Sequence, residues 1–255
     1  MPVATDLRRV AATRYATALR EGGSLPGLVE ADDDGLYVVK FTGAGQGSRA
    51  LVAEVLVGEL ARALGLPVPE LVVAEIDPAL AQAEPDSEIR DLVRGSPGPN
   101  LGVDFLPGAL PFTPAGGFRP DPELAAAVVW LDALTTNVDR TAQNPNLLLW
   151  HERMWLIDHG AALYRQHAGL DPASAAQPFP QVEDHVLLPF AGSVAEADAR
   201  LAPQVDQTLL EELVALVPYP WFAGLAPAAY VEYLGRRLQA PRGFVEEAER
   251  ARARR

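Results

Sequence analysis

Three short strand patterns separated by two turns open the chain and predict an antiparallel meander. The strands are Arg14–Leu19, Leu25–Glu30 and Leu36–Phe41, and the turns are Glu21–Ser24 and Ala31–Gly35. We expect a helix to follow, with Ser48 as its N-cap and an end near Leu64, because Gly65 and Pro67 stop it. Leu71–Ile76 then reads as a further strand. An antiparallel sheet with one helix is therefore predicted for the N-terminal part of the chain.

Prolines and glycines are dense over residues 77–120, and within that stretch only Asn100–Leu106 reads as ordered. A stretch of this composition favours a connection between two packed units rather than a regular element. We therefore expect the chain to divide into an N-terminal lobe, residues 1–106, and a C-terminal lobe, residues 107–255.

The C-terminal lobe is predicted to be mostly helical. Asp121 and Pro122 mark the cap and the first residue of a buried helix that ends near Asn137. A hairpin and amphipathic helices follow; the hairpin strands are Asn146–Trp150 and Met154–Ile157, and the helices span 207–217, 226–238 and 246–255. Residues 160–192 have little periodicity, which predicts a long loop or several short helical turns. The expected fold class is α+β.

The composition excludes several classes of function. The 255 residues carry a formal net charge of −13, which disfavours nucleic acid and acidic membranes as partners because both attract basic surfaces. The absence of cysteine excludes disulfides, thiolate catalysis and cysteine-ligated metals, and favours a reducing, cytoplasmic location. No histidine spacing matches a zinc hydrolase, and no segment reads as membrane-spanning.

One lysine stands among 21 basic residues. The other 20 are arginines, so arginine serves wherever charge alone matters. Lys40 lies on the third strand of the meander, and its retention indicates a place that needs a compact ammonium rather than a planar guanidinium. The alternative is that Lys40 lies at the surface and has been retained by chance, without a specific role.

The predicted helix offers two carboxylates as partners for Lys40. Glu59 has Arg62 three residues later and reads as part of an ordinary surface pair. The helical neighbours of Glu54 are Ala50, Leu51, Val57 and Gly58. A carboxylate on such an apolar face is costly unless it is paired, so Glu54 is the predicted partner, unless it lies at a rim that reaches water.

Three oxygen-bearing residues in the C-terminal half have an informative spacing. Asn144 follows Asp139 by five residues, and Asp158 follows Asp139 by nineteen, across the predicted hairpin. Phosphoryl transfer uses a carboxylate that orients the acceptor beside hard oxygen ligands for Mg²⁺. Each residue alone reads as a turn or cap residue; together with the strand lysine they predict a phosphotransferase.

These motifs resemble those of HipA-like kinases and of the related type II phosphatidylinositol 4-kinases. The resemblance rests on Leu60–Pro69, on Asn137–Arg140 with Asn144, and on Ile157–Gly160, and it covers roughly Gly22 to Gly160. It implies a two-lobed protein-kinase-like fold that uses ATP and Mg²⁺, with a protein serine or threonine hydroxyl as the expected acceptor. A small metabolite and a lipid head group stay open as alternative acceptors.

The resemblance also implies a role for each matching residue. Lys40 binds the ATP phosphates and Glu54 positions it, while Asp139 is the catalytic aspartate. Asn144 and Asp158 hold Mg²⁺. The phosphates are covered by Gly22, Gly23 and Ser24, and the adenine hinge is formed by Asp104, Phe105 and Leu106.

Two alternative functions remain. A pseudokinase would bind nucleotide or act as a scaffold without turnover, although none of the usual lysine, aspartate or metal-ligand losses is present. Residues Gly43–Ser48 lie between a strand and a helix and could instead begin the dinucleotide fingerprint of an NAD(P)-dependent oxidoreductase. Its third glycine position is Ser48, and regular strand–helix alternation does not follow.

Overall fold

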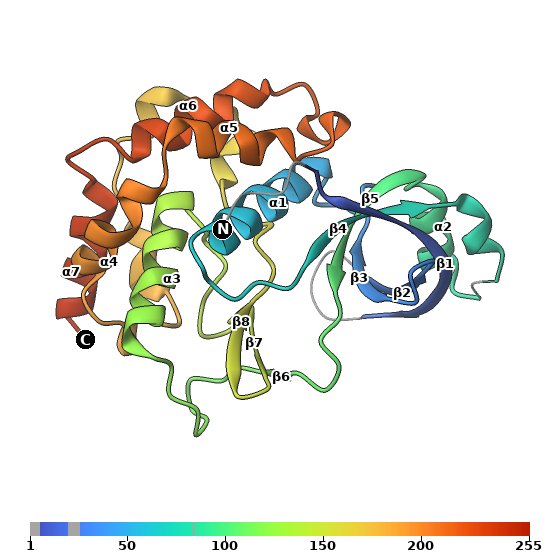
Figure 1. Ribbon diagram of the computed structural model, residues 1–255, viewed down its shortest axis with the longest axis horizontal. Coiled ribbons are helices and arrows are strands. Elements are labelled where there is room, and N and C mark those ends of the chain that lie inside the picture. The colour runs from blue at the N-terminus through green and yellow to red at the C-terminus, as the bar shows by residue number, and fades with distance from the viewer. Residues whose placement is uncertain (1–5, 20–25, 84) are drawn as a thin grey trace.

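The chain folds into two lobes, the first built mainly of strands and the second mainly of helices (Figure 1). The computed structural model describes residues 6–19, 26–83 and 85–255. The N-terminal lobe is a closed barrel of strands in the order β1-β2-β3-β5-β4. These strands are β1 (Arg8–Ala18), β2 (Gly27–Ala31), β3 (Leu36–Lys40), β4 (Leu71–Ile76) and β5 (Gly98–Asp104). The predicted α+β class, with a sheet-rich first lobe and a mostly helical second one, is confirmed.

The barrel closes through a pairing that the meander pattern did not predict. β1 begins at Arg8 rather than at Arg14, and its first residues pair in parallel with β4. The other neighbouring strands pair antiparallel. The early part of β1 carries two adjacent arginines, so it lacks the clear apolar alternation by which strands are recognised in a sequence.

The expectation that residues 77–120 are ordered only at Asn100–Leu106 is wrong. The 3₁₀ helix η1 (Pro78–Ala83) and helix α2 (Ser87–Arg94) precede β5 at the outer end of the barrel (Figure 1). Asp86 caps α2, and only Ile89 and Val93 are buried. Two buried positions in eight residues, in a proline-rich context, are too weak a pattern to predict a helix.

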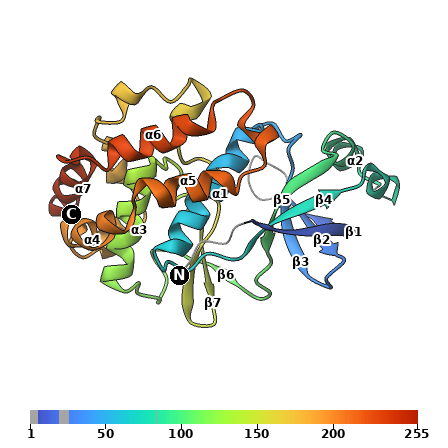
Figure 2. The same ribbon diagram turned by 45° about the horizontal axis from the view of Figure 1, so that its top comes forward.

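Helix α1 (Ser48–Ala63) connects the barrel to the second lobe. Its N-cap is Gly47 and not Ser48, which is the first helical residue. The buried side chains of α1 join the apolar core of the C-terminal lobe, whereas the barrel interior forms a separate core with α2. Figure 2 shows α1 between the barrel and the C-terminal helices. A movement of α1 would therefore disturb the larger core.

The C-terminal lobe combines a small sheet with five α-helices in the described part of the chain. Strands β6 (Leu110–Pro111), β7 (Leu147–Trp150) and β8 (Arg153–Leu156) form the sheet, and the helices are α3 (Pro122–Thr135), α4 (Val194–Leu201), α5 (Gln207–Ala215), α6 (Pro227–Arg237) and α7 (Gly243–Ala253). Short 3₁₀ helices connect them: η2 (Tyr164–His167), η3 (Pro172–Ser174), η4 (Pro180–Asp184), η5 (Leu188–Phe190), η6 (Ala202–Gln204) and η7 (Tyr219–Phe222). We propose that the lobes divide after Leu106, between β5 and β6.

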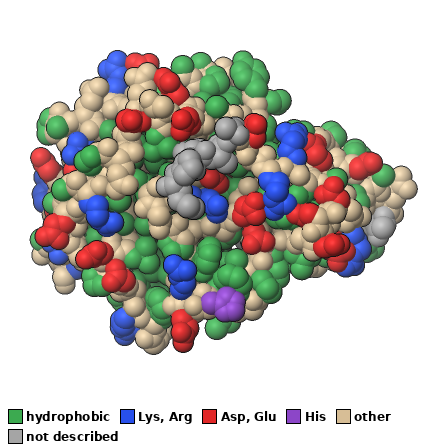
Figure 3. Space-filling model, viewed as in Figure 1, with side chains coloured by type: hydrophobic (Ala, Val, Ile, Leu, Met, Phe, Trp, Pro, Cys, Tyr) green, Lys and Arg blue, Asp and Glu red, His purple; other side chains and the backbone are tan. Residues whose placement is uncertain are grey.

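Charged side chains of both signs are interspersed over the face shown in Figure 3, and no extended basic patch is seen on it. Within the described residues, no helix is long and apolar enough to cross a membrane.

Close packing inside the barrel leads to a stability prediction. A Cβ atom added to Gly102 on β5 would lie 2.7 Å from Cγ2 of Val72, a buried β-branched side chain that cannot swing away. We expect Gly102→Ala to lower the free energy of unfolding by about 1–3 kcal/mol. Gly235 on α6 has open space around it, so Gly235→Ala should be neutral or stabilising by up to about 1 kcal/mol. Denaturant unfolding of both variants checks this, and equal destabilisation would contradict it.

Candidate functional site

The lone lysine is held between two carboxylates where the lobes meet. Nζ of Lys40, at the end of β3, contacts Oε1 of Glu54 on α1 and lies 2.8 Å from Oδ1 of Asp158. The side chains of Lys40 and Glu54 are 12% and 3% exposed, whereas that of Asp158 is 43% exposed. Sequence elements more than 100 residues apart therefore meet at one ammonium group.

Glu54 also holds the segment that follows Asp158. Its second oxygen, Oε2, accepts a hydrogen bond of 2.8 Å from the backbone N–H of His159. A Cβ atom on Gly160 would lie 2.8 Å from Oε1 of Glu54, so only glycine permits this approach. Asp158 itself has a left-handed backbone with φ of 56°. The turn at Asp158 is thus fixed by Lys40, which contacts the Asp158 side chain, and by Glu54, which accepts the N–H of His159.

The electrostatics of the cluster keep the ammonium charged. Burial alone would lower the pKa of Lys40, but attraction to Glu54 and Asp158 outweighs it and raises that pKa. Burial raises the pKa of Glu54, against the opposing effect of Lys40. Desolvation would raise the pKa of Asp158, but the neighbouring ammonium of Lys40 outweighs it and lowers that pKa. One cation thus faces two carboxylates, and the more exposed of them is the more firmly ionised.

A loop after α3 presents Asp139. The loop begins at Thr136, which ends α3 with a left-handed backbone. Nδ2 of Asn144 donates a 2.8 Å hydrogen bond to Oδ2 of Asp139, and Nδ2 of Asn146 lies 3.3 Å from the same oxygen. The predicted pair Asp139 and Asn144 is thus in direct contact. Asn146 was not predicted, although it follows Asn144 by two residues.

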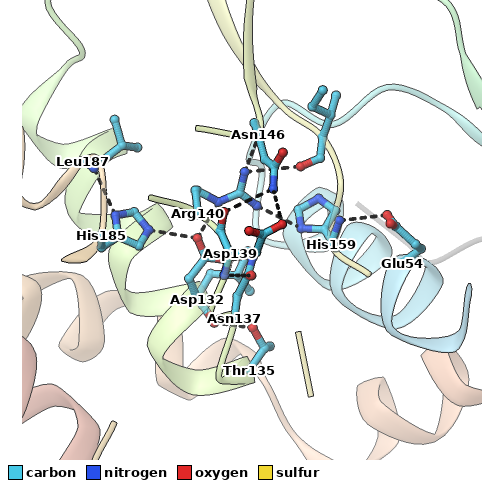
Figure 4. A network of polar contacts seen from close by, with 12 residues as sticks. Glu54, Asp132, Thr135, Asn137, Asp139, Arg140, Asn146, His159, His185 and Leu187 are labelled. Carbon is cyan, nitrogen blue, oxygen red and sulfur yellow. Dashed lines mark hydrogen bonds and ion pairs between the residues drawn. The ribbon is translucent and has the colours of Figure 1, made fainter. Parts of the chain in front are cut away.

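A buried polar network lies beneath this loop (Figure 4). Nε of Arg140 lies 2.5 Å from Oδ2 of Asp132 on α3, and both side chains are fully buried. Nη1 of Arg140 donates to the carbonyl oxygens of both Asn146 and Ile157, and Nη2 lies 3.2 Å from Nδ1 of His159. One guanidinium therefore joins α3, the Asp139 loop and the segment around Asp158.

Two further side chains complete the network. Asn137 donates a 3.0 Å hydrogen bond to Asp132 through Nδ2 and accepts one from the backbone N–H of Asp139 through Oδ1. His185 accepts the N–H of Leu187 at Nδ1, so its Nε2–H is the atom that donates to Asp132, 2.9 Å away. Asp132 is therefore satisfied on both oxygens.

The two protonation states in the network follow from these contacts. Burial and the positive charge of Arg140 lower the pKa of His159 to about 3, so its ring is neutral and Nδ1 accepts from Arg140. Burial would raise the pKa of Asp132, but Arg140 and His185 lower it well below its usual range. Sequence reasoning missed this network, although one charged residue within the apolar stretch of α3 was a visible signal.

The structure describes the positions of only some of the remaining predicted residues. Gly22, Gly23 and Ser24 lie outside the described residues. Asp104 and Phe105 end the barrel, where their N–H groups donate to the carbonyls of Glu70 and Leu36, and Leu106 is buried next to them. No direct contact joins Asn144 to Asp158 in the structure. Within the described chain no group of three or more acidic or histidine side chains is placed to hold a metal ion.

The glycine-rich segment Gly43–Ser48 does not belong to a dinucleotide-binding unit. That unit requires parallel neighbouring strands on either side of the helix. Here β3 and β4 are not neighbours, and each pairs antiparallel with β5. The N–H of Gly43 donates to Oγ of Ser96, which ties the loop to the end of α2. The oxidoreductase alternative therefore has no support in the fold.

Known proteins are similar to this chain in sequence family and in fold. A family model described as HipA-like kinase matches residues 14–223. The structure is similar to the Helicobacter pylori proinflammatory kinase CtkA, with a TM-score of 0.57 and 15% identity over 92% of this chain and 94% of that chain. It is also similar to the Golgi casein kinase with Mn/ADP bound, with a TM-score of 0.53 and 13% identity over 97% of this chain and 74% of that one. No curated protein compared with the chain matches it in sequence.

The buried network leads to a second stability prediction. Arg140→Met leaves Asp132 charged and buried without its main partner, and we expect a loss of about 3–5 kcal/mol in the free energy of unfolding. Arg236 forms an exposed pair with Glu232, so Arg236→Met should cost less than about 1 kcal/mol. Urea unfolding of both variants measures the difference. A similar small loss in both would show that the buried pair is not what holds the loop.

Proposed function

The chain belongs to the HipA-like kinase family, and we propose that it transfers the γ-phosphoryl group of ATP to a hydroxyl group, with a protein serine or threonine as the expected acceptor. The single observation that carries the proposal is the contact of Lys40 with both Glu54 and Asp158. A kinase needs its strand lysine, its helix glutamate and its metal-binding aspartate together at one point. Family membership and the two-lobed fold support the same conclusion.

Lys40 is the proposed phosphate-binding group. Its ammonium stays charged because two carboxylates surround it, and Glu54 holds it from the buried side. Asp158 is the more exposed partner, so the ammonium is shared between a fixed carboxylate and one that faces solvent. A triphosphate that approaches from the solvent side would meet a preorganised cation, which is the arrangement that stabilises developing charge.

Asp139 is the proposed catalytic aspartate. Hydrogen bonds from Asn144 and Asn146 hold one of its oxygens, and the Asn137 side chain holds its backbone N–H. A carboxylate fixed in this way can accept the hydrogen bond of an acceptor hydroxyl and orient its oxygen toward the γ-phosphorus. As the new P–O bond forms, the bond between the γ-phosphorus and the β,γ-bridging oxygen breaks and ADP leaves, while the proton of the hydroxyl passes to this carboxylate.

Asn144 and Asp158 fit a magnesium site by the chemistry of their donor atoms. The amide nitrogen of Asn144 is used on Asp139, which leaves its amide oxygen as the atom that a cation would meet. The ionised, partly exposed carboxylate of Asp158 is a hard oxygen ligand. Mg²⁺ is commonly held by one or two carboxylates together with substrate phosphates, and when bound it neutralises the β- and γ-phosphate charge.

The remaining assignments of the nucleotide site are also proposals. Gly22, Gly23 and Ser24, which lie outside the described residues, would cover the phosphates. Asp104, Phe105 and Leu106 would provide the hinge for adenine, because they follow β5 where the chain leaves the barrel.

Turnover of ATP tests the proposal directly. We expect Mg-dependent ATP hydrolysis or autophosphorylation by the wild type, and a fall of about 100-fold in kcat/KM in Lys40→Arg, because a guanidinium cannot fit between Glu54 and Asp158 in the same geometry. The exposed Arg153 allows the reverse change as a control, and Arg153→Lys should retain full activity.

The Asp139→Asn variant gives the background rate of ATP turnover in the same assay. A wild type no more active than Asp139→Asn would identify the chain as a pseudokinase. Full activity in Lys40→Arg would remove Lys40 from the mechanism.

A further inference from the structure

Helix α1 is tied to the C-terminal lobe by one arginine at its start. Arg49 is the second residue of α1, and its guanidinium donates to three backbone carbonyl oxygens. Nη1 lies 2.9 Å from the oxygen of Gln166, Nη2 lies 2.9 Å from that of Ala223, and Nε lies 3.3 Å from that of Phe222. These partners come from η2 and from the end of η7, more than 110 residues away in sequence.

Local structure does not explain an arginine at this position. Positive charge in the first turn of a helix opposes the helix dipole, which favours acidic residues there. The first turn of α1 has no acidic residue, and its N-cap, Gly47, provides no side-chain hydrogen bond. The start of α1 therefore lacks the usual local stabilisation by a cap and by acidic residues. The long-range hydrogen bonds of Arg49 stabilise it instead.

The carbonyl groups that Arg49 binds are themselves held in place. Trp221 in η7 is buried, and its Nε1 donates a 3.2 Å hydrogen bond to the carbonyl of Pro99 at the start of β5. Gln166 is also buried, and its Oε1 accepts a 2.8 Å hydrogen bond from the hydroxyl of Tyr230 on α6. Helix α1 packs against both η7 and α5, and Figure 2 shows α5 passing beside it. The segments that Arg49 binds are thus themselves tied to β5 of the barrel and to α6.

Glu54 follows Arg49 by five residues, about one and a half helical turns along α1. Its two oxygens must reach Lys40 on β3 and the N–H of His159 at the same time. That requirement fixes both the rotation and the axial position of α1. Because a helix is a stiff element, a contact that anchors its first turn also places Glu54.

We propose that Arg49 is a positioning residue that fixes α1, through η2 and η7, in the orientation in which Glu54 contacts Lys40 and His159 together. The inference rests on the proposed function, since it assigns to the C-terminal lobe the task of assembling the phosphate-binding lysine. This chain carries that anchor within its own fold.

The same substitution at the two ends of α1 tests the proposal. Arg62 also donates to a backbone carbonyl, that of Val68 at 3.0 Å, but this contact lies within the N-terminal half of the chain. Arg49→Met and Arg62→Met therefore remove matched side chains, and Arg49→Lys keeps the charge without the forked geometry. The readouts are amide hydrogen exchange of the peptides 48–63 and 122–135, and kcat and KM for Mg·ATP hydrolysis.

We expect Arg49→Met to speed exchange in 48–63 by about tenfold while 122–135 on α3 is unchanged. We also expect kcat to fall by about tenfold with a change of less than about threefold in KM, because Glu54 positions a group that acts on the transferred phosphoryl. Arg49→Lys should fall between wild type and Arg49→Met, and Arg62→Met should match wild type.

Equal exchange and equal kcat in Arg49→Met and Arg62→Met would overturn the proposal. An equal acceleration of 48–63 and 122–135 would also overturn it, because Arg49 would then support the whole lobe rather than α1. A wild type that neither binds nor turns over Mg·ATP would overturn the proposed function instead, and the exchange comparison would still decide whether Arg49 anchors α1.

Discussion

One largely buried ammonium links the two lobes of this protein at a single cluster. Lys40 comes from the barrel, Glu54 from the helix between the lobes, and Asp158 from the turn after the small sheet. Desolvation disfavours each of these charges, and their proximity offsets the cost only while all three stay together. The arrangement of β3, α1 and the Asp158 turn therefore depends on one cluster. We propose that the phosphates of ATP bind at the same cluster, because a kinase holds its strand lysine and its metal-binding aspartate next to them.

Two further sets of contacts keep the cluster assembled. Below it, the guanidinium of Arg140 links α3 to the carbonyls on either side of the small sheet and to the ring of His159. Beside it, Arg49 links the first turn of α1 to the C-terminal helices. Both arginines use their planar fork on several backbone carbonyls at once, whereas a lysine would present all three of its donors from one nitrogen atom. This use fits a chain that contains 20 arginines and one lysine.

The sequence allowed a site residue to be predicted where the chemistry of its position permits few residue types. Lys40 stood out because it is the only lysine, and Glu54 because an unpaired carboxylate on an apolar helix face is costly. The buried pairing of Asp132 with His185 could not be predicted from the sequence. The two residues are 53 positions apart and meet only through the packing of α3. Long-range packing also decided where β1 began and whether α2 formed. The HipA-like resemblance and the two-lobed kinase-like fold are confirmed, whereas the roles of individual site residues stay proposals.

Binding of Mg·ATP at the Lys40 cluster can be measured by a thermal-shift titration. Wild type and Asp158→Asn are compared with ATP alone and with Mg·ATP. We expect Mg·ATP at about 100 times its Kd to stabilise the wild type by about 2.7 kcal/mol, and Asp158→Asn to lose most of that gain. We also expect a smaller shift with ATP alone, because Asp158 and Asn144 need the cation to bind the phosphates. An unchanged midpoint for the wild type at millimolar Mg·ATP, or an equal shift in Asp158→Asn, would contradict the account.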